Sequence, residues 1–292
     1  MTARFKASCS TGIFKQVEKC QLKNTTWKIT PQGLTYQAHP RFDKFGTPVM
    51  AELYLSPKEF KSFECREEFM MGINSRHFKR ALKCTDWLDT IVFSVDEDVS
   101  YFEFVIYNQR GECKKSQTFK LKCTPVELLK PFVKKESHHV SELKMSSERF
   151  KDIVNAMRKI SELRNDIKIC MSKDKVIFES VGDNWCHSST VTITPKGENC
   201  TYNVPPTTTV EAAFRNVQLD YPIHNMYTNE NILLKFTEQK ELVAEYRILK
   251  CGYMRYYLAS QLTIKQEHHK LSKRKGIPVK NECKVKKERF YE

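Results

Sequence analysis

The chain contains the same unit twice, and this internal repeat limits its fold more than any other feature of the sequence. Each unit reads as a basic amphipathic helix, a β-hairpin, a second helix and a second hairpin. Corresponding helices stand at an offset of roughly 136 residues, which is an ordinary size for one domain. The chain of 292 residues therefore predicts two similar α+β domains, each with two helices packed on antiparallel β-sheets.

The helices are predicted from apolar and cationic residues that recur on separate faces. Residues 13–23 place Phe14 on an apolar face and lysines on another, and residues 75–84 carry the sharpest cationic stripe, with spacing i, i+3, i+4, i+7. A third helix follows Ser146 or Ser147, either of which can act as N-cap. A fourth is expected at about 210–219, with Arg215 as its cation and Pro222 as its end.

Each helix is followed by two strand-like runs that flank a polar turn, which is the signature of a β-hairpin. The four hairpins are expected at residues 26–37, 91–107, 167–180 and 232–248. The first and third correspond, as do the second and fourth. The repeat places an N-terminal domain at 1–122, a connector at 123–141, a C-terminal domain at 142–263 and a basic tail at 264–292.

Composition narrows the class of protein. The longest apolar runs have the length of strands, which argues against a membrane span, and eleven cysteines without a secretory signal read as reduced thiols. The formal net charge is +14, and residues 265–287 are rich in lysine with little apolar patterning, as expected of a disordered tail. That tail can be merely solvated, a nuclear import signal, or an electrostatic tether to nucleic acid.

No catalytic motif is present. The sequence lacks a phosphate-binding glycine loop, a nucleophile elbow and any pair of cysteines at metal-binding spacing, so no enzyme activity, cofactor or bound metal is expected. Asp96 and Asp98 could in principle hold Mg²⁺ for a nuclease, but they lie at a predicted hairpin tip, where a solvated turn is the simpler interpretation. The basic helices instead predict a positively charged binding surface.

Two longer motifs resemble the proliferating cell nuclear antigen family. The run Cys-Arg-Glu-Glu-Phe-Met-Met-Gly-Ile-Asn at 65–74, followed by Phe-Lys-Arg-Ala-Leu-Lys-Cys at 78–84, is similar to a strand and pore-lining helix of that family. The runs at 242–248 and 252–259 resemble its last two strands, and weaker similarity at 27–34 and 147–153 extends the resemblance across residues 5–259.

The resemblance implies a sliding clamp, in which three chains commonly close into a ring with helices around the hole. Such a ring holds duplex DNA without sequence preference, through phosphate contacts from Lys and Arg. By position, the implied DNA-binding residues are Lys15, Lys19, Lys23, Arg76, Lys79, Arg80, Lys83, Lys151, Arg158, Lys159 and Arg215. The implied subunit interface pairs two edge strands through Lys115, Gln117, Thr118, Phe119, Thr190, Val191, Thr192 and Ile193.

Clamps of this family also recruit DNA polymerases and repair enzymes through an apolar pocket, and a clamp loader is an expected partner. The residues implied for that pocket are Pro48, Met50, Val126, Leu129, Pro131, Tyr257 and Ala259. The expected function is a polymerase processivity factor in the nucleus or a viral replication compartment. A subunit of a heterotrimeric checkpoint clamp and a processivity factor without a closed ring remain open, as do the Mg²⁺-dependent nuclease and a sequence-specific nucleic-acid binder.

Overall fold

The computed structural model describes residues 4–12, 14, 24–38, 49–83, 85–108, 116–124, 126, 139–160, 166–181, 188–194, 200–205, 209–224, 231–248 and 252–261. The first half contains β1 (Phe5–Ser10), β2 (Asn24–Thr30), β3 (Gly33–Ala38), β4 (Val49–Leu55), a 3-10 turn (Pro57–Glu59), β5 (Ser62–Cys65), β6 (Phe69–Asn74), α2 (Ser75–Lys83), β7 (Thr90–Val95), β8 (Tyr101–Tyr107) and β9 (Ser116–Lys122). The second contains β10 (His139–Ser146), α3 (Ser147–Ile160), β11 (Asp166–Met171), β12 (Val176–Val181), β13 (Ser188–Ile193), β14 (Thr201–Asn203), β15 (Val210–Arg215), α4 (Asn216–His224), β16 (Asn231–Thr237), β17 (Leu242–Ile248) and β18 (Gly252–Leu258).

The described strands form three antiparallel sheets that repeat one pattern. The sheet β5-β1-β7-β8-β9 in the first half corresponds to β14-β10-β16-β17-β18 in the second, and β4-β3-β2-β6 corresponds to β13-β12-β11-β15. Strands β18 and β4 pair directly, so the last strand of the second half joins the first half in one nine-stranded sheet. The repeat expected from the sequence is therefore present: each half contributes one five-stranded and one four-stranded set, and the nine-stranded sheet joins one set from each half.

All four predicted hairpins are present as antiparallel pairs, namely β2·β3, β7·β8, β11·β12 and β16·β17. The first turn needs glycine, because Gly33 has φ +148° and a Cβ there would lie 2.5 Å from the carbonyl oxygen of Leu55. The turns before Val99 and Lys240 match each other, and both residues have positive φ, at 51° and 63°. The two halves thus share turn geometry as well as strand order.

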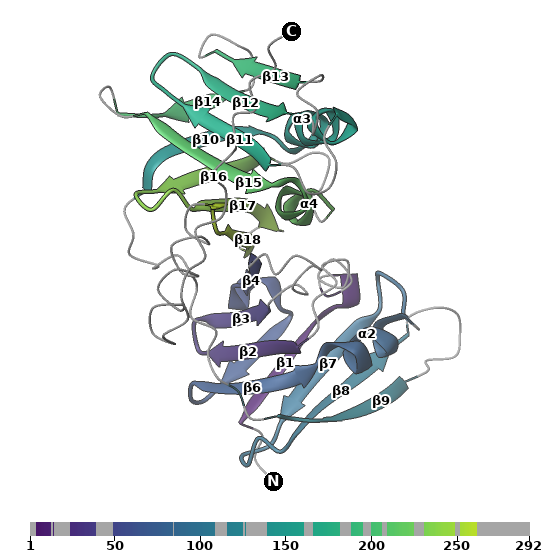
Figure 1. Ribbon diagram of the computed structural model, residues 1–292. Coiled ribbons are helices and arrows are strands. Elements are labelled where there is room, and N and C mark those ends of the chain that lie inside the picture. Colours follow the sequence, from purple (N-terminus) through teal and green to yellow (C-terminus); the bar gives the residue numbers. More distant parts are fainter. Residues whose placement is uncertain are drawn as a thin grey trace, which may run out of the picture.

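The helices α2, α3 and α4 lie on one side of the molecule, to the right in Figure 1. Helix α2 buries Phe78, Ala81 and Leu82 against the sheets of the first half. The ring of Phe78 lies 5.5 Å from that of Trp27 and 5.7 Å from that of Phe14, measured between centroids. This aromatic core fixes α2 and leaves its opposite face in solvent.

Helix α3 begins where the sequence predicts. The hydroxyl of Ser146 accepts a hydrogen bond of 3.2 Å from the backbone N–H of Arg149, which is the contact of an N-cap. Phe150, Val154 and Met157 are fully buried on one face. Of the first predicted helix, at 13–23, the structure describes only Phe14, which is helical and fully buried as expected; residues 11 and 12 just before it are also helical.

The fourth helix was predicted at the wrong position. Val210–Arg215 is strand β15, which buries Val210, Ala212 and Phe214 at alternate positions and pairs with β11. The helix begins afterwards at Asn216 and contains Pro222 instead of ending before it. The spacing of Val210 and Phe214 fits both periods, so only pairing with β11 decided between them. None of the helices that the structure describes is long and apolar enough to cross a membrane.

Candidate functional site

Helix α2 presents the clearest cationic surface among the described residues. Arg76, Arg80 and Lys83 are exposed and spaced i, i+4, i+7, so they share one face, whereas Lys79 is half-buried beside them. The side chain of Asn74 accepts a hydrogen bond of 3.0 Å from the N–H of Arg76 and so caps the first turn. The helix is therefore a rigid support for a row of positive charge.

Helix α3 contributes cations of two kinds. Lys151 and Lys159 are exposed, as expected of residues that meet phosphates. Arg158 instead forms an ion pair of 3.0 Å with Asp220 of α4, and the carboxylate of Asp220 is 13% exposed. Arg158 thus links the two helices of the second half, and its charge is largely matched within the chain. This contact could not be read from the sequence, because α4 was placed wrongly.

Among the described residues, helix α4 does not repeat the cationic stripe of α2. At the positions equivalent to Arg76, Lys79 and Arg80, helix α4 carries Val217, Asp220 and Tyr221. Arg215 was expected on this helix, but it is the half-buried last residue of β15, and its N–H donates to the side chain of Gln218 at 2.9 Å. The placement of Arg215 on a helix was therefore wrong, whereas its role in binding DNA stays a prediction.

Three predicted DNA-binding residues, Lys15, Lys19 and Lys23, lie outside the described residues. Their positions correspond at the repeat offset to Lys151, Asn155 and Lys159 of α3. Two of the three positions thus carry a lysine in both halves.

Strands β9 and β13 both lie at sheet edges, where an added strand can pair. On β9, Phe119 stacks on Phe104 at 5.0 Å between centroids, while Gln117 and Thr118 are exposed. On β13, Ile193 is buried, Val191 is half-buried, and Thr190 and Thr192 are exposed. Lys115 lies outside the described residues.

The predicted partner pocket is only partly assembled among the described residues. Met50, Val243 and Tyr257 form a small buried cluster separate from the main core, on three adjacent strands. Ala259 is the first residue after β18 and is 2% exposed. Val126 instead lies against Gly72, at the far edge strand β6 of the same sheet. Pro48, Leu129 and Pro131 lie outside the described residues.

Glu52 of β4 is fully buried beside this cluster, which the sequence did not indicate. Its carboxylate accepts hydrogen bonds from Gln37 at 2.8 Å, from Tyr257 at 3.3 Å and from Tyr253 at 3.4 Å. Arg255 lies 3.9 Å away and also bonds Glu245 at 2.6 Å. A buried carboxylate needs such partners. The network therefore ties β18 to β4 and fixes the hydroxyl end of Tyr257.

The same contacts shift the pKa values of the two tyrosine hydroxyls in this network. Burial, together with the negative charge of Glu52, raises the pKa of Tyr253 to about 12 and raises the pKa of Tyr257 further. Both hydroxyls consequently stay protonated at neutral pH and can act as donors to Glu52.

The nuclease alternative finds no support in the described part of the chain, where no group of three His, Cys, Asp or Glu side chains could hold a metal. Asp98 is exposed at the β7–β8 turn and accepts a hydrogen bond from the N–H of Ser100 at 3.3 Å. A hydrogen bond from the Ser100 side chain, together with this backbone bond, lowers the pKa of Asp98. Asp98 therefore acts as a turn residue.

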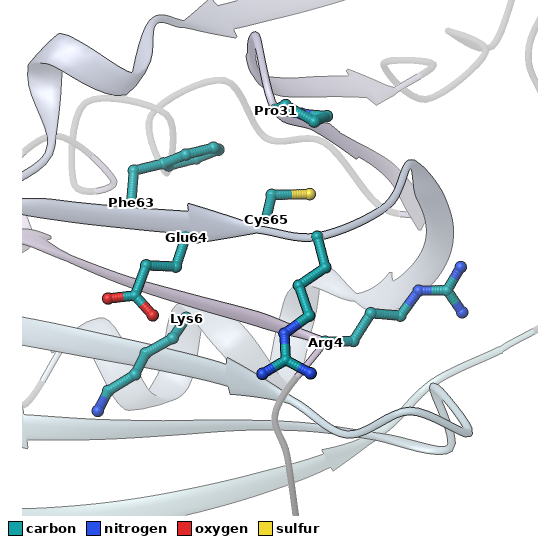
Figure 2. Close-up of a pocket in the computed structure, with 7 residues that line it drawn as sticks. Arg4, Lys6, Pro31, Phe63, Glu64 and Cys65 are labelled. Atoms are coloured by element: carbon teal, nitrogen blue, oxygen red, sulfur yellow. The ribbon is translucent and has the colours of Figure 1, made fainter.

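A cavity of about 650 Å³ lies between β1, β5 and the β2–β3 turn. Figure 2 shows Phe63 and Cys65 directed toward Pro31, while Lys6 and Arg4 extend in different directions. The guanidinium of Arg4 stacks over the ring of Phe69, 5.2 Å from its centroid, and forms an ion pair with Glu67 at 3.5 Å. Burial raises the pKa of the Cys65 thiol, so it is not an activated nucleophile. The cavity presents neither a catalytic pair nor a converging set of charges.

Comparison with protein families agrees with the repeated fold. A model of the N-terminal domain of proliferating cell nuclear antigen matches residues 2–128, and a model of its C-terminal domain matches residues 134–261. The predicted resemblance and the α+β fold of two like domains are thereby confirmed, whereas the limits drawn for the connector and the tail remain predictions. With both domain models matched in order along most of its length, the chain belongs to the proliferating cell nuclear antigen family of sliding clamps.

Proposed function

We propose that this protein is a DNA polymerase processivity factor, three copies of which close into a ring around duplex DNA. The observation that carries the proposal is the pairing of β18 with β4 inside the chain. By sheet order, β9 is the first-half equivalent of β18, and β13 is the second-half equivalent of β4. Each chain therefore has one such joint made internally and leaves the two equivalent strands at free edges.

Pairing β9 of one chain with β13 of the next would repeat the internal joint. This contact is heterologous, because two different edges meet, and heterologous contacts generate closed rings when the rotation between copies closes. Transferring the register of the internal joint places Phe119 opposite Ser189 and Thr118 opposite Thr190 of the next chain. The exposure of these residues agrees, since Phe119 and Ser189 are half-buried and both threonines are exposed.

The DNA-facing surface in this proposal is the side that carries α2 and α3. The exposed cations on rigid helices, Arg76, Arg80, Lys83, Lys151 and Lys159, suit contacts to phosphates, which position a duplex but carry no sequence information. Many weak contacts of this kind allow sliding, and a closed ring prevents loss of the DNA. The overall charge of +14 favours the same partner.

Partner proteins would bind at the cluster of Met50, Val243 and Tyr257, together with the predicted segment that contains Leu129 and Pro131. A short peptide with apolar anchors is the expected ligand, because apolar anchor side chains bind where apolar residues and a fixed tyrosine lie together. DNA polymerase, repair enzymes and a clamp loader are the proposed partners. We place the protein in the nucleus or a viral replication compartment and propose no enzymatic activity.

The decisive experiment combines oligomeric state with a test of topology. Light scattering over a range of concentrations should give a trimer, and a protein that stays monomeric throughout would refute the homotrimer. In the variant with Thr118→Cys and Thr190→Cys, oxidation should join neighbouring chains, since directly opposed Cβ atoms lie within disulfide reach. The matched control is Thr118→Cys with Ser188→Cys, in which the cysteines are out of register.

The oxidised ring also allows a test that distinguishes a ring around DNA from a protein that merely binds to the DNA surface. If the chains surround DNA, rings closed on a nicked circular plasmid should stay bound in high salt, whereas rings on a linear duplex should slide off its ends. Equal loss from both substrates would contradict encirclement. A heterotrimeric clamp subunit would instead form no covalent homotrimer at any concentration.

A further inference from the structure

The turn between α2 and β7 carries two adjacent exposed apolar side chains. Trp87 is 48% exposed and Leu88 is 81% exposed. A single exposed apolar residue is ordinary, whereas a tryptophan and a leucine exposed side by side form a small apolar patch, and such patches are candidate ligand-binding surfaces. Neither residue belongs to any of the binding surfaces described above.

The turn is held rigidly on the first half. The carbonyl oxygen of Trp87 accepts hydrogen bonds from the Ser10 hydroxyl at 2.6 Å and from the Gly12 N–H at 3.3 Å. Across the turn, the N–H of Asp86 donates to the Asp89 carboxylate at 2.7 Å, and the N–H of Asp89 donates to the Asp86 carbonyl at 3.3 Å. Asp89 is 1% exposed, so its charge is directed into the protein. Trp87 and Leu88 are thus presented on a fixed support.

The indole ring itself is positioned by Gly12. A Cβ at residue 12 would lie 3.0 Å from Cε3 of Trp87 and 3.1 Å from its carbonyl oxygen, which is too close for an unstrained contact. Glycine therefore permits the ring to lie close to the start of the first helical segment. A side chain held in this way loses little conformational entropy when a ligand covers it.

The turn follows the C-terminal end of α2 closely in the chain. Lys83 is the last residue of the helix and stands four positions before Trp87, and Arg76, Arg80 and Lys83 are exposed along the same face. An aromatic face at the end of a row of cations matches a single-stranded nucleic acid, in which phosphates alternate with bases that can stack. This charge complementarity favours DNA over an apolar protein surface.

We propose that Trp87 and Leu88 form a stacking platform for an unpaired base at the point where duplex DNA along α2 becomes single-stranded. The proposal rests on the proposed function, since it takes the α2 cations to contact the duplex. Stacking has no sequence preference, because every base offers a π-face. The site would therefore favour gaps and overhangs over continuous duplex.

The test compares a blunt hairpin duplex with the same duplex that carries an oligothymidine overhang. The wild-type protein should bind the overhang probe at least about fivefold more tightly, in line with stacking of one base. Trp87→Ala should reduce this ratio to near one while blunt-duplex affinity stays unchanged, and Trp87→Phe should keep part of it. Tyr101→Ala, which removes a 42% exposed ring from β8, should keep the wild-type ratio.

A ratio in Trp87→Ala equal to that of the wild type would overturn the proposal. If that variant also lost its stimulation of a polymerase, the turn would be identified as a protein-binding surface instead. Gly12→Ala provides a second variant, because it displaces the ring without removing it and should also lower the ratio. Failure of the proposed function would appear separately, as blunt-duplex binding that does not depend on the α2 cations.

Discussion

Replacing Arg76, Arg80 and Lys83 together with alanine tests whether α2 meets DNA phosphates. All three side chains are exposed, whereas Phe78 and Leu82, which anchor the helix, are 5% and 1% exposed. Alanine also has the highest helix propensity, so the fold should be kept. The substitution therefore removes three charges from one face with little effect on stability.

The expected magnitude follows from counterion release. Each phosphate contact contributes about 0.9 to the slope of log affinity against log salt, so three lost contacts should flatten that slope by about 2.7 for each engaged subunit. Between about 50 and 200 mM salt, the affinity of the variant should consequently fall by about 40-fold less than that of the wild type. The loss should be the same for any DNA sequence.

Fluorescence anisotropy with a labelled duplex at several salt concentrations measures this slope. The matched control replaces Lys144, Lys173 and Lys175 with alanine; these lysines are exposed on β10 and the β11–β12 turn, and none of them is on a helix. Both variants have the same net charge, so a difference between them reports position alone. Equal slopes in the two variants would refute the assignment of α2 to the DNA-facing surface.

Three further predictions concern stability. Val99→Asn should raise the free energy of unfolding by about 1 kcal/mol in denaturant titration, because a β-branched residue is strained at φ 51°; Val99→Ala, which keeps a Cβ in the left-handed region, should gain less. Burial raises the pKa of Glu245, but the hydrogen bond and charge of Arg255 outweigh it, so the pKa is lowered from 4.5. The stability from this pair should be complete above about pH 4.5 and lost as the pH falls through the lowered value, and Glu245→Gln should remove that part of the dependence of melting temperature on pH. Phe78→Ala should cost about 3–5 kcal/mol, since it opens a cavity among aromatic rings; a cost below about 1 kcal/mol would contradict the packing of α2.

The sequence alone determined the elements that depend on neighbouring residues. The four hairpins and helices α2 and α3 lie where the sequence predicts them, since each follows from a turn, a cap or a short apolar period. The family could be recognised for the same reason, because its two longer motifs are continuous runs of the chain. The sequence also predicted the cationic stripe on α2, although only the structure shows that Arg80 is exposed while Lys79 is half-buried.

Residues 210–224 mark the limit of local patterns. Phe214 fits a helical stripe and an alternating strand equally well, and pairing of β15 with β11 decided for the strand. The error placed Arg215 on a helix and hid the ion pair between Arg158 and Asp220. Short apolar runs carry too little information to choose a period, so contacts with distant strands override propensity.

Only the tertiary structure decided what happens where the two halves meet. Glu52 is fully buried, which no local pattern in the sequence indicates, because β18 brings Tyr253, Tyr257 and Arg255 beside it. By sheet order, β9 and β13, which lie at sheet edges among the described strands, are the equivalents of the joined strands β18 and β4. Strand order depends on contacts between residues some 200 positions apart, and no local pattern of side chains records which edge meets which.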